Sequence, residues 1–198
     1  MFTGIITDKG AVTDVTEGAR SRRLKIRTAL PLDRIAIGAS VACDGCCLTV
    51  VEKGADWLAF DAAAETLAKT TLGDWQDGTE VNLETSLCMG DEMGGHMVSG
   101  HVDGLAVVES VTQDGDAWRL EIKVPAELVP YIAPKGSVTL NGISLTVNAV
   151  EGAVLGVCII PHTWQVTNIS RWHAGYKINL EVDMLARYVA RILGKEAA

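Results

Sequence analysis

Residues 38–50 read GASVACDGCCLTV, and residues 135–147 read KGSVTLNGISLTV. The two stretches align without a gap, and their central glycines lie 142 − 45 = 97 residues apart, about half of the 198-residue chain. A match of this length at such an offset indicates a duplicated structural unit and not a chance similarity. The chain is therefore expected to form two similar domains.

Each copy of the repeat has a hairpin signal at its centre, Asp44-Gly45 in the first and Asn141-Gly142 in the second. Both dipeptides favour the tight turn that joins two antiparallel strands. Around the first copy, further short strands broken by glycine and aspartate are expected at 4–6, 10–12, 23–28, 57–62 and 80–85, and the second half repeats this order. Short, evenly spaced strands predict a small closed barrel, which leaves no exposed sheet edge.

The expected fold is thus all-β, with two tandem six-stranded antiparallel barrels that arise from the internal repeat. The first barrel is assigned to residues 1–97 and the second to 98–183. A Greek-key strand order is expected for each barrel, although the spacing of the strands does not itself specify that order. Between the barrels, residues 89–100 read MGDEMGGHMVSG and are expected to form a linker or a closely packed turn.

A C-terminal α-helix is expected within residues 184–198, outside the repeat. Asp183 is suited to cap its first turn and Gly194 to end it. The apolar side chains recur at helical spacing along one face: Leu185, Tyr188, Val189, Ile192 and Leu193. This face must be buried somewhere, and periodicity alone leaves two alternatives open, a contact between subunits or packing on the chain's own barrel.

Composition limits the possible classes of protein. The net charge is −8 and aromatic residues make up 5% of the chain, which disfavours nucleic-acid binding, including binding by an oligonucleotide-binding barrel. No apolar run reaches the length of a membrane span, and the first residues lack the basic and apolar regions of a signal peptide. The five cysteines are odd in number and unevenly placed, so reduced thiols and a cytoplasmic location are expected.

Cys43 and Cys46 have the Cys-x-x-Cys spacing of a zinc ligand pair, but the remaining cysteines supply no second pair. The second copy has Leu140 and Ile143 at these two positions. A position that accepts cysteine in one copy and an aliphatic residue in the other indicates core packing. No metal site is therefore expected.

Cys47 is different, because its counterpart is Ser144 and not an aliphatic residue. Adjacent residues of a strand face opposite sides, so Cys47 is expected to point away from the core that Cys46 enters. A small polar group at the same place in both copies is suited to a ligand-facing site. A position that merely tolerates small residues is the alternative.

Two histidines, His96 and His101, flank the sequence MVSG at the end of the glycine-rich linker. Their spacing does not place both on one helix face, and no cluster of acidic ligands follows them. On this evidence a histidine in such a loop is expected to be a surface residue. The run also lacks the Gly-Lys-Ser/Thr of a phosphate loop and the strand–turn–helix setting of a serine hydrolase.

Four motifs in sequence order resemble those of riboflavin synthase of the α-chain type. They read MFTGI at 1–5, ASVACDGCCLTV at 39–50, GGHMVSGHVDG at 94–104, and GISLTV at 142–147 with IPHT at 160–163. The resemblance extends over essentially the whole chain. It implies a transferase that converts two molecules of 6,7-dimethyl-8-ribityllumazine into riboflavin and 5-amino-6-(ribitylamino)uracil, the last step of riboflavin biosynthesis, with no metal or organic cofactor.

The resemblance also implies a homotrimer held together by the C-terminal helices. Each active site would bind two lumazines between the N-terminal barrel of one subunit and the C-terminal barrel of another. A duplicated chain suits a reaction between two copies of one molecule, because it supplies two similar pockets for the same ring system. An association with lumazine synthase is left open.

By this resemblance, the substrate contacts in the N-terminal barrel are Gly4, Ile5, Ile6, Cys47, Leu48, Thr49, Asp61, Ala62, Ala63, Ala64, Glu65, Thr66, Gly100, His101 and Val102. Those in the C-terminal barrel are Ser144, Leu145, Thr146, Cys158, Ile159, Ile160, Pro161, His162 and Thr163. Lys135 is expected to reach a ligand held by the neighbouring subunit.

Four residues are expected to affect turnover. His101 is suited to move protons at neutral pH, Ser40 or Cys47 to assist addition at the acceptor ring, and Phe2 to close the pocket. The alternative function is a lumazine- or flavin-binding protein of the same superfamily without activity. The motifs are intact in both copies, which favours the enzyme.

Overall fold

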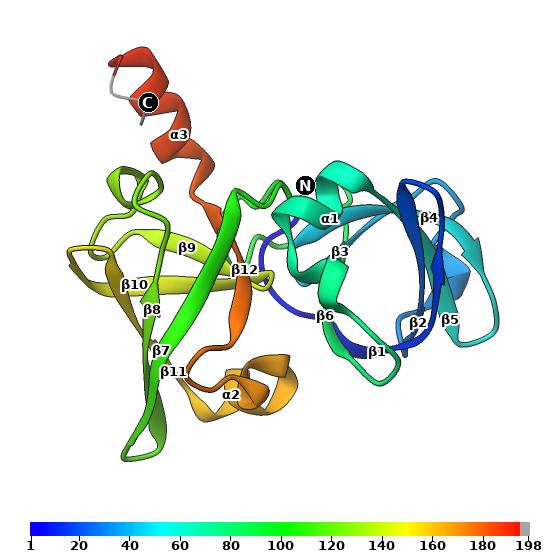
Figure 1. The fold of residues 1–198 in the computed structure, drawn as a ribbon, viewed down its shortest axis with the longest axis horizontal. Coiled ribbons are helices and arrows are strands. Elements are labelled where there is room, and N and C mark those ends of the chain that lie inside the picture. Colours follow the sequence, from blue (N-terminus) through cyan, green and yellow to red (C-terminus); the bar gives the residue numbers. More distant parts are fainter. Residues whose placement is uncertain (195–198) are drawn as a thin grey trace.

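The computed structural model describes residues 1–194, which form two closed antiparallel barrels side by side and one C-terminal helix (Figure 1). The N-terminal barrel consists of β1 (Asp8–Glu17), β2 (Ser21–Arg27), β3 (Ser40–Cys43), β4 (Cys46–Lys53), β5 (Trp57–Ala63) and β6 (Glu80–Thr85). The C-terminal barrel consists of β7 (Gly104–Asp114), β8 (Ala117–Lys123), β9 (Ser137–Leu140), β10 (Ile143–Glu151), β11 (Val154–Ile159) and β12 (Lys177–Val182).

The strand order is the same in both barrels. Around the first it is β1-β2-β5-β4-β3-β6, and around the second β7-β8-β11-β10-β9-β12. Both orders are Greek keys, so the prediction of two tandem six-stranded Greek-key barrels is confirmed. A bulge bends β1 between Val12 and Asp14 and β7 between Val108 and Ser110, at matching places.

Short helices connect the strands at equivalent points of the two barrels. In the N-terminal barrel these are a 3-10 turn η1 (Leu32–Arg34), α1 (Ala64–Lys69) and a 3-10 turn η2 (Thr71–Asp74). In the C-terminal barrel they are η3 (Val129–Tyr131), α2 (Pro161–Val166) and η4 (Asn168–Arg171). The repeat therefore extends beyond the strands to their connections.

Two predicted strands are wrong, the one at 4–6 and its counterpart at 100–102, which also forms no strand. Residues 4–6 form no strand, and β1 begins only at Asp8. Gly4 has a φ of +75°, which interrupts an extended strand, and its amide donates a 2.9 Å hydrogen bond to the side chain of Glu84. The segment is therefore held by this carboxylate and by one hydrogen bond from the amide of Ser144, and not by strand pairing.

The two hairpin turns meet where the barrels join. Both residues of each turn have positive φ, 44° and 78° at Asp44-Gly45 and 44° and 80° at Asn141-Gly142, as a type I′ turn requires. A Cβ atom added to Gly45 would lie 2.7 Å from the amide nitrogen of Gly142, and one added to Gly142 would lie 2.8 Å from that of Gly45. The barrels thus touch through main chain at two glycines.

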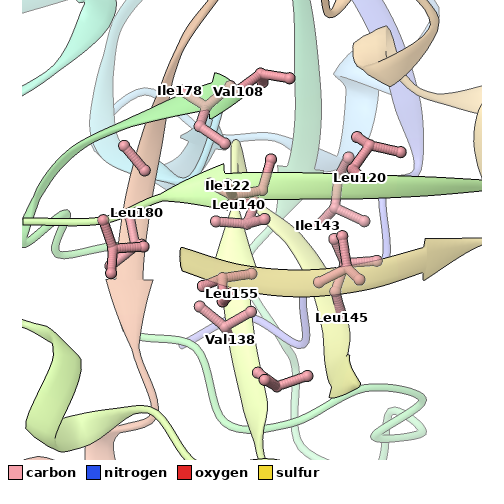
Figure 2. Close-up of a cluster of buried hydrophobic side chains, with 14 of the residues drawn as sticks. Val108, Leu120, Ile122, Val138, Leu140, Ile143, Leu145, Leu155, Ile178 and Leu180 are labelled. Carbon is pink, nitrogen blue, oxygen red and sulfur yellow. The ribbon is translucent and has the colours of Figure 1, made fainter. Parts of the chain in front are cut away.

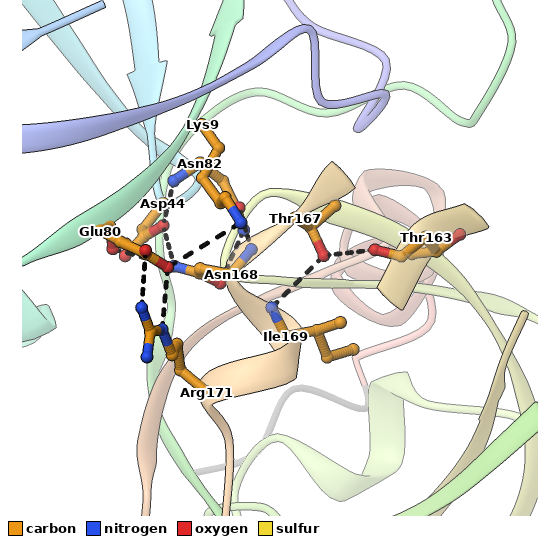
Figure 3. Close-up of polar contacts among 9 residues, drawn as sticks. All are labelled: Lys9, Asp44, Glu80, Asn82, Thr163, Thr167, Asn168, Ile169 and Arg171. Atoms are coloured by element: carbon orange, nitrogen blue, oxygen red, sulfur yellow. Dashed lines mark hydrogen bonds and ion pairs between the residues drawn. The ribbon is translucent and has the colours of Figure 1, made fainter. Parts of the chain in front are cut away.

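Asparagine side chains surround this contact in a nearly two-fold arrangement. Asn82 donates from its side chain to the carbonyl oxygen of Asn141, and Asn179 donates to that of Asp44, each at 2.9 Å. Figure 3 shows Asn168 of the C-terminal barrel reaching Asn82 and Asp44 of the N-terminal barrel. Thr71 takes the equivalent place in the first copy, and its buried hydroxyl has no hydrogen-bond partner within residues 1–194.

Each barrel has its own apolar core. Cys43 and Cys46 are buried in the first core, which confirms them as packing residues. Leu140 and Ile143 take their places in the second core, where Figure 2 shows them among the other inward-facing aliphatic side chains. The alternation of the strands predicts this core because every second residue enters it.

The C-terminal helix α3 (Met184–Ile192) projects from the C-terminal barrel (Figure 1). Asp183 caps it as predicted, since its carboxylate accepts a 2.8 Å hydrogen bond from the amide of Leu185. No residue of α3 is buried, so packing on the chain's own barrel does not cover the apolar face. Residues 195–198 of the predicted segment lie outside the described residues. No helix within residues 1–194 is long and apolar enough to cross a membrane.

Candidate functional site

The first site is formed on the outer face of β4, next to the hairpin turn. Cys46, Leu48 and Val50 point into the barrel and are buried, whereas Cys47 is half-buried and Thr49 exposed. This is the alternation expected of a strand. The prediction that Cys46 and Cys47 face opposite sides is therefore confirmed.

Cys47 opens on a cavity of about 340 Å³. Three parts of the chain line it: the start of β4, the end of β5 with α1, and residues 100–102, which precede β7. Its lining residues are Cys46, Cys47, Ala63, Glu65, Thr66, Lys69, Thr70, Gly100, His101 and Val102. The predicted contacts Cys47, Ala63, Glu65, Thr66 and 100–102 are thus brought together around one cavity.

Several other residues assigned to this site lie elsewhere. Leu48 and Ala62 face the core and offer a ligand only their main chain. The carboxylate of Asp61 accepts two hydrogen bonds from the guanidinium of Arg23, at 2.8 and 2.9 Å, and these bonds lower the pKa of Asp61. Ala64 is exposed at the first position of α1 and does not line the cavity.

Residues 4–6 belong to the other barrel. The carbonyl oxygen of Gly4 accepts a 2.8 Å hydrogen bond from the amide of Ser144, just as that of Gly100 accepts one from the amide of Cys47, also at 2.8 Å. Ile6 packs on the core of the C-terminal barrel. The assignment of Gly4, Ile5 and Ile6 to the N-terminal barrel is therefore corrected: they lie beside Ser144.

The C-terminal barrel presents the matching set of residues. On β10, Leu145 faces the core while Ser144 is half-buried and Thr146 exposed. On β11 and α2, Ile159 is buried in the core and Thr163 is half-buried, while the exposed positions are Cys158, Ile160, Pro161 and His162. Both barrels thus place a small polar residue and a threonine on one outer face.

His96 is a functional candidate that the sequence did not reveal. Its Nδ1 lies 2.7 Å from the hydroxyl oxygen of Ser144, and its Nε2 lies 3.1 Å from that of Thr139. The ring is half-buried, and burial lowers the pKa of His96, which favours the neutral imidazole. The prediction of a surface histidine is wrong here, whereas His101 is indeed exposed.

The remaining predicted residues lie around these faces. Phe2 is fully buried and packs with Ala42 and Val98 next to Cys47, so it lies behind the cavity. Ser40 is paired with Thr49 across the hairpin but lines a separate cavity of about 260 Å³. Lys135 is exposed in the turn before β9.

Acidic, thiol and imidazole groups do not gather into a metal centre in the described part of the chain. No three histidine, cysteine, aspartate or glutamate side chains of residues 1–194 lie close enough together to hold a metal ion. Besides two cysteines, the ionisable groups that line the Cys47 cavity are one carboxylate, one ammonium group and one imidazole, from Glu65, Lys69 and His101. Such a lining can hydrogen-bond a polar ring and exchange protons with it.

Comparisons with known proteins agree with this duplicated site. The lumazine binding domain matches the chain twice, at residues 3–86 and 99–183. The chain is 49% identical to riboflavin synthase of Brucella abortus (strain 2308), over 97% of this chain and 98% of the relative. It is 41% identical to riboflavin synthase of Photobacterium phosphoreum, over 98% and 89% of the two chains.

Solved structures show the same fold with ligands bound. The crystal structure of LumP complexed with riboflavin has a TM-score of 0.84 and 25% identity, covering 92% of this chain and 99% of that one. LumP complexed with 6,7-dimethyl-8-(1'-D-ribityl) lumazine has a TM-score of 0.81, with the same identity and coverage. From the repeated domain and the full-length relatives, the chain belongs to the riboflavin synthase family.

Proposed function

We propose that the Cys47 cavity and the matching face at Ser144 are the two lumazine sites of a riboflavin synthase. The observation that supports this most strongly is the equivalence of the two faces. Each has a small polar residue at the start of a strand, next to a glycine of positive φ whose carbonyl oxygen accepts that residue's amide. Two copies of one substrate need two such similar faces.

The reaction transfers a four-carbon unit from one 6,7-dimethyl-8-ribityllumazine to another. Riboflavin and 5-amino-6-(ribitylamino)uracil are the products. The ring's 7-methyl group is acidic because its carbanion is delocalised into the lumazine, so the protein has mainly to orient two rings and move protons. Holding both rings in reacting geometry removes up to roughly 7–11 kcal/mol of the barrier.

Differences between the two faces suit different roles for the two substrates. In the N-terminal barrel, exposed His101 borders the cavity and can exchange protons with a bound ring. In the C-terminal barrel, His96 instead contacts the hydroxyl of Ser144 and can orient or activate it. Cys47 rather than Ser40, which lines a separate cavity, assists addition at the acceptor ring in this scheme. Lys135 reaches a ligand of the neighbouring subunit.

The complete active site is proposed to form between subunits of a homotrimer. The exposed apolar face of α3 supports this, since Leu185, Tyr188 and Ile192 are 59%, 60% and 82% exposed in the single chain. A face of this kind, on a helix none of whose residues is buried in the single chain, suits contact with a second copy. The five unpaired cysteines suit the reducing cytoplasm. Association with a lumazine synthase stays a prediction.

The test is to incubate the purified protein alone with 6,7-dimethyl-8-ribityllumazine and follow riboflavin by absorbance. Riboflavin formation without any added cofactor supports the proposal. The likeness to LumP, a protein solved with riboflavin and with the lumazine bound, favours one alternative, a binding protein without activity. Tight binding without riboflavin formation would select that alternative, and no binding would contradict both.

A further inference from the structure

Two buried glutamates, which the proposed mechanism does not use, occupy equivalent positions at 84 and 181. Glu84 lies in β6 and Glu181 in β12, and they are 4% and 3% exposed. Burial is the main cause that raises the pKa of each carboxyl, while the hydrogen bonds that each accepts act in the opposite direction. A buried carboxyl group is costly unless its environment satisfies it, so its partners matter.

Each glutamate binds the main chain of a short segment in the same way. Glu84 accepts hydrogen bonds from the amide and hydroxyl of Thr3, both at 2.7 Å, and from the amide of Gly4 at 2.9 Å. The hydroxyl of Thr3 also accepts the amide of Ile5 at 3.2 Å. One side chain thus holds three consecutive residues of what we name the Gly4 segment (residues 3–6).

Glu181 makes the same set of contacts with the Gly100 segment (residues 99–102). It accepts the amide and hydroxyl of Ser99, at 2.7 and 2.6 Å, and the amide of Gly100 at 3.0 Å. The amide of His101 then donates to the hydroxyl of Ser99 at 3.3 Å. His101, which borders the Cys47 cavity, is therefore held in place through Ser99 and Glu181.

Both segments cross to the opposite barrel. The Gly4 segment is held by Glu84 of the N-terminal barrel but contacts Ser144 of the C-terminal barrel. The Gly100 segment is held by Glu181 of the C-terminal barrel but contacts Cys47 of the N-terminal barrel. Each barrel thus supplies the carboxylate that holds the edge of the other barrel's site.

Each segment lies so close to the residue that it borders that its glycine has no room for a side chain. A Cβ atom added to Gly4 would lie 2.6 Å from Cβ of Ser144, and one added to Gly100 would lie 2.6 Å from Cβ of Cys47. The residues that directly precede the two segments are also joined, because Phe2 and Val98 exchange main-chain hydrogen bonds of 2.8 and 3.1 Å. A small movement of either segment therefore changes the site that it borders.

We propose that Glu181 is a positioning residue for the lumazine site of the N-terminal barrel, and Glu84 for that of the C-terminal barrel. A change in one barrel then acts first on the site of the other. The assignment of these two sites to lumazine rests on the proposed function. The crossed positioning is tested without substrate, so a failure of the lumazine assay would not decide it.

The test compares Glu181→Gln with Glu84→Gln by amide hydrogen exchange of the full-length protein. Glutamine keeps the size of the side chain but turns one acceptor oxygen into an amide group, which then faces a main-chain N–H. We expect Glu181→Gln to speed exchange of the Cys47 amide roughly tenfold and to leave the Ser144 amide unchanged. Glu84→Gln should do the reverse.

A second readout uses the thiols. In Glu181→Gln, alkylation of Cys47 by iodoacetamide, followed by mass spectrometry of its peptide, should speed up several-fold against the exposed Cys88 and Cys158 of the same chain. Glu84→Gln should leave all three rates near those of the wild type. A merely structural glutamate would instead loosen its own barrel.

Two outcomes would overturn the proposal. One is that each variant speeds exchange only within its own barrel, and the other is that both variants affect Cys47 and Ser144 equally. If a glutamine variant does not fold, Ser99→Ala and Thr3→Ala form a milder matched pair, since each removes a single hydroxyl from the same network. The same crossed pattern is then expected, and its absence contradicts the proposal.

Discussion

The side-chain amide of Asn168, in the C-terminal barrel, donates a 2.9 Å hydrogen bond to Oδ1 of Asp44 in the N-terminal barrel. Asp44 also accepts the amide of Asn82 at 2.8 Å. Burial outweighs these bonds and raises the pKa of Asp44 to about 8. The joint between the barrels therefore contains a carboxyl group that keeps its proton near neutral pH.

This pKa predicts how stability depends on pH. An unfolded Asp44 would lose its proton near pH 3.8, whereas the folded one keeps it to about pH 8. Between these values the native state binds more protons than the unfolded state, so the free energy of unfolding should fall as pH rises, by up to about 1.4 kcal/mol per pH unit. Asp44→Asn, which copies Asn141, should flatten this dependence in urea unfolding measured from pH 4 to pH 9 (roughly the span of the shift). An equally steep dependence in the variant would rule out Asp44 as its source.

Replacement of the cavity thiol tests covalent catalysis. Because Ser144 takes the place of Cys47 in the other copy, we expect Cys47→Ser to keep kcat within about tenfold of the wild type. Steady-state riboflavin formation measures this, with Cys88→Ser, at an exposed thiol outside the Cys47 cavity, as the control. A loss of three or more orders of magnitude (roughly 4 kcal/mol) in Cys47→Ser alone would make the thiol an obligate nucleophile.

His101→Gln should lower kcat by about a hundredfold, since general acid–base groups contribute roughly that factor or more. The introduced side-chain amide would keep a hydrogen bond but could not transfer a proton, so KM should change little. His173→Gln is the matched control, because His173 is also exposed but does not line the Cys47 cavity. Equal activity of the His101 variant and the control would remove His101 from the proton pathway.

Gly100→Ala should destabilise the protein by about 2–4 kcal/mol, because overpacking against Cys47 adds to the strain of a non-glycine residue at a φ of +79°. Gly115→Ala separates these causes. Gly115 also has positive φ, 63°, but an added Cβ would meet nothing within 4 Å, so only about 1 kcal/mol is expected there. Similar losses for the two variants in urea unfolding would show that the close contact at Cys47 is not rigid.

Ile192→Glu should prevent assembly of the proposed trimer, because it places a charge on the apolar face of α3, at the most exposed of its large apolar side chains. Sedimentation velocity should then show monomers, whereas the wild type is expected to sediment as the proposed trimer. Ile37→Glu is the control, as Ile37 is also exposed, at 63%, but lies in the N-terminal barrel. If both variants sediment as the wild type does, α3 is not the contact between subunits.

The fold could be predicted from the sequence because its signals are local and occur twice. The Asp44-Gly45 and Asn141-Gly142 turns each determine a hairpin within a few residues, and alternation along β4 decides that Cys46 enters the core while Cys47 does not. Comparison of the copies also separated positions in the core, such as Cys46, from outward-facing positions, such as Cys47. Neither step requires knowledge of distant contacts.

The sequence could not show which barrel each glycine segment contacts. The repeat relates Gly4 to Gly100, but this correspondence is the same whether a segment packs on its own barrel or on the other one. The crossing depends on hydrogen bonds from Glu84 and Glu181, which are about 80 residues away in the chain. His96 was missed for a related reason: at the offset of the first strands its counterpart would precede Met1, so no internal comparison could single it out.

The back-to-back turns at Gly45 and Gly142 have a consequence for how such a chain could arise. Each glycine meets the other in the same way, so the joint is an isologous contact made within one polypeptide. A single ancestral barrel with this face would pair with a second copy of itself by the same contacts. Gene fusion would then turn such a homodimer into one chain, and afterwards Asp44 and Asn141, or Cys47 and Ser144, were free to diverge while the symmetry of the joint remained.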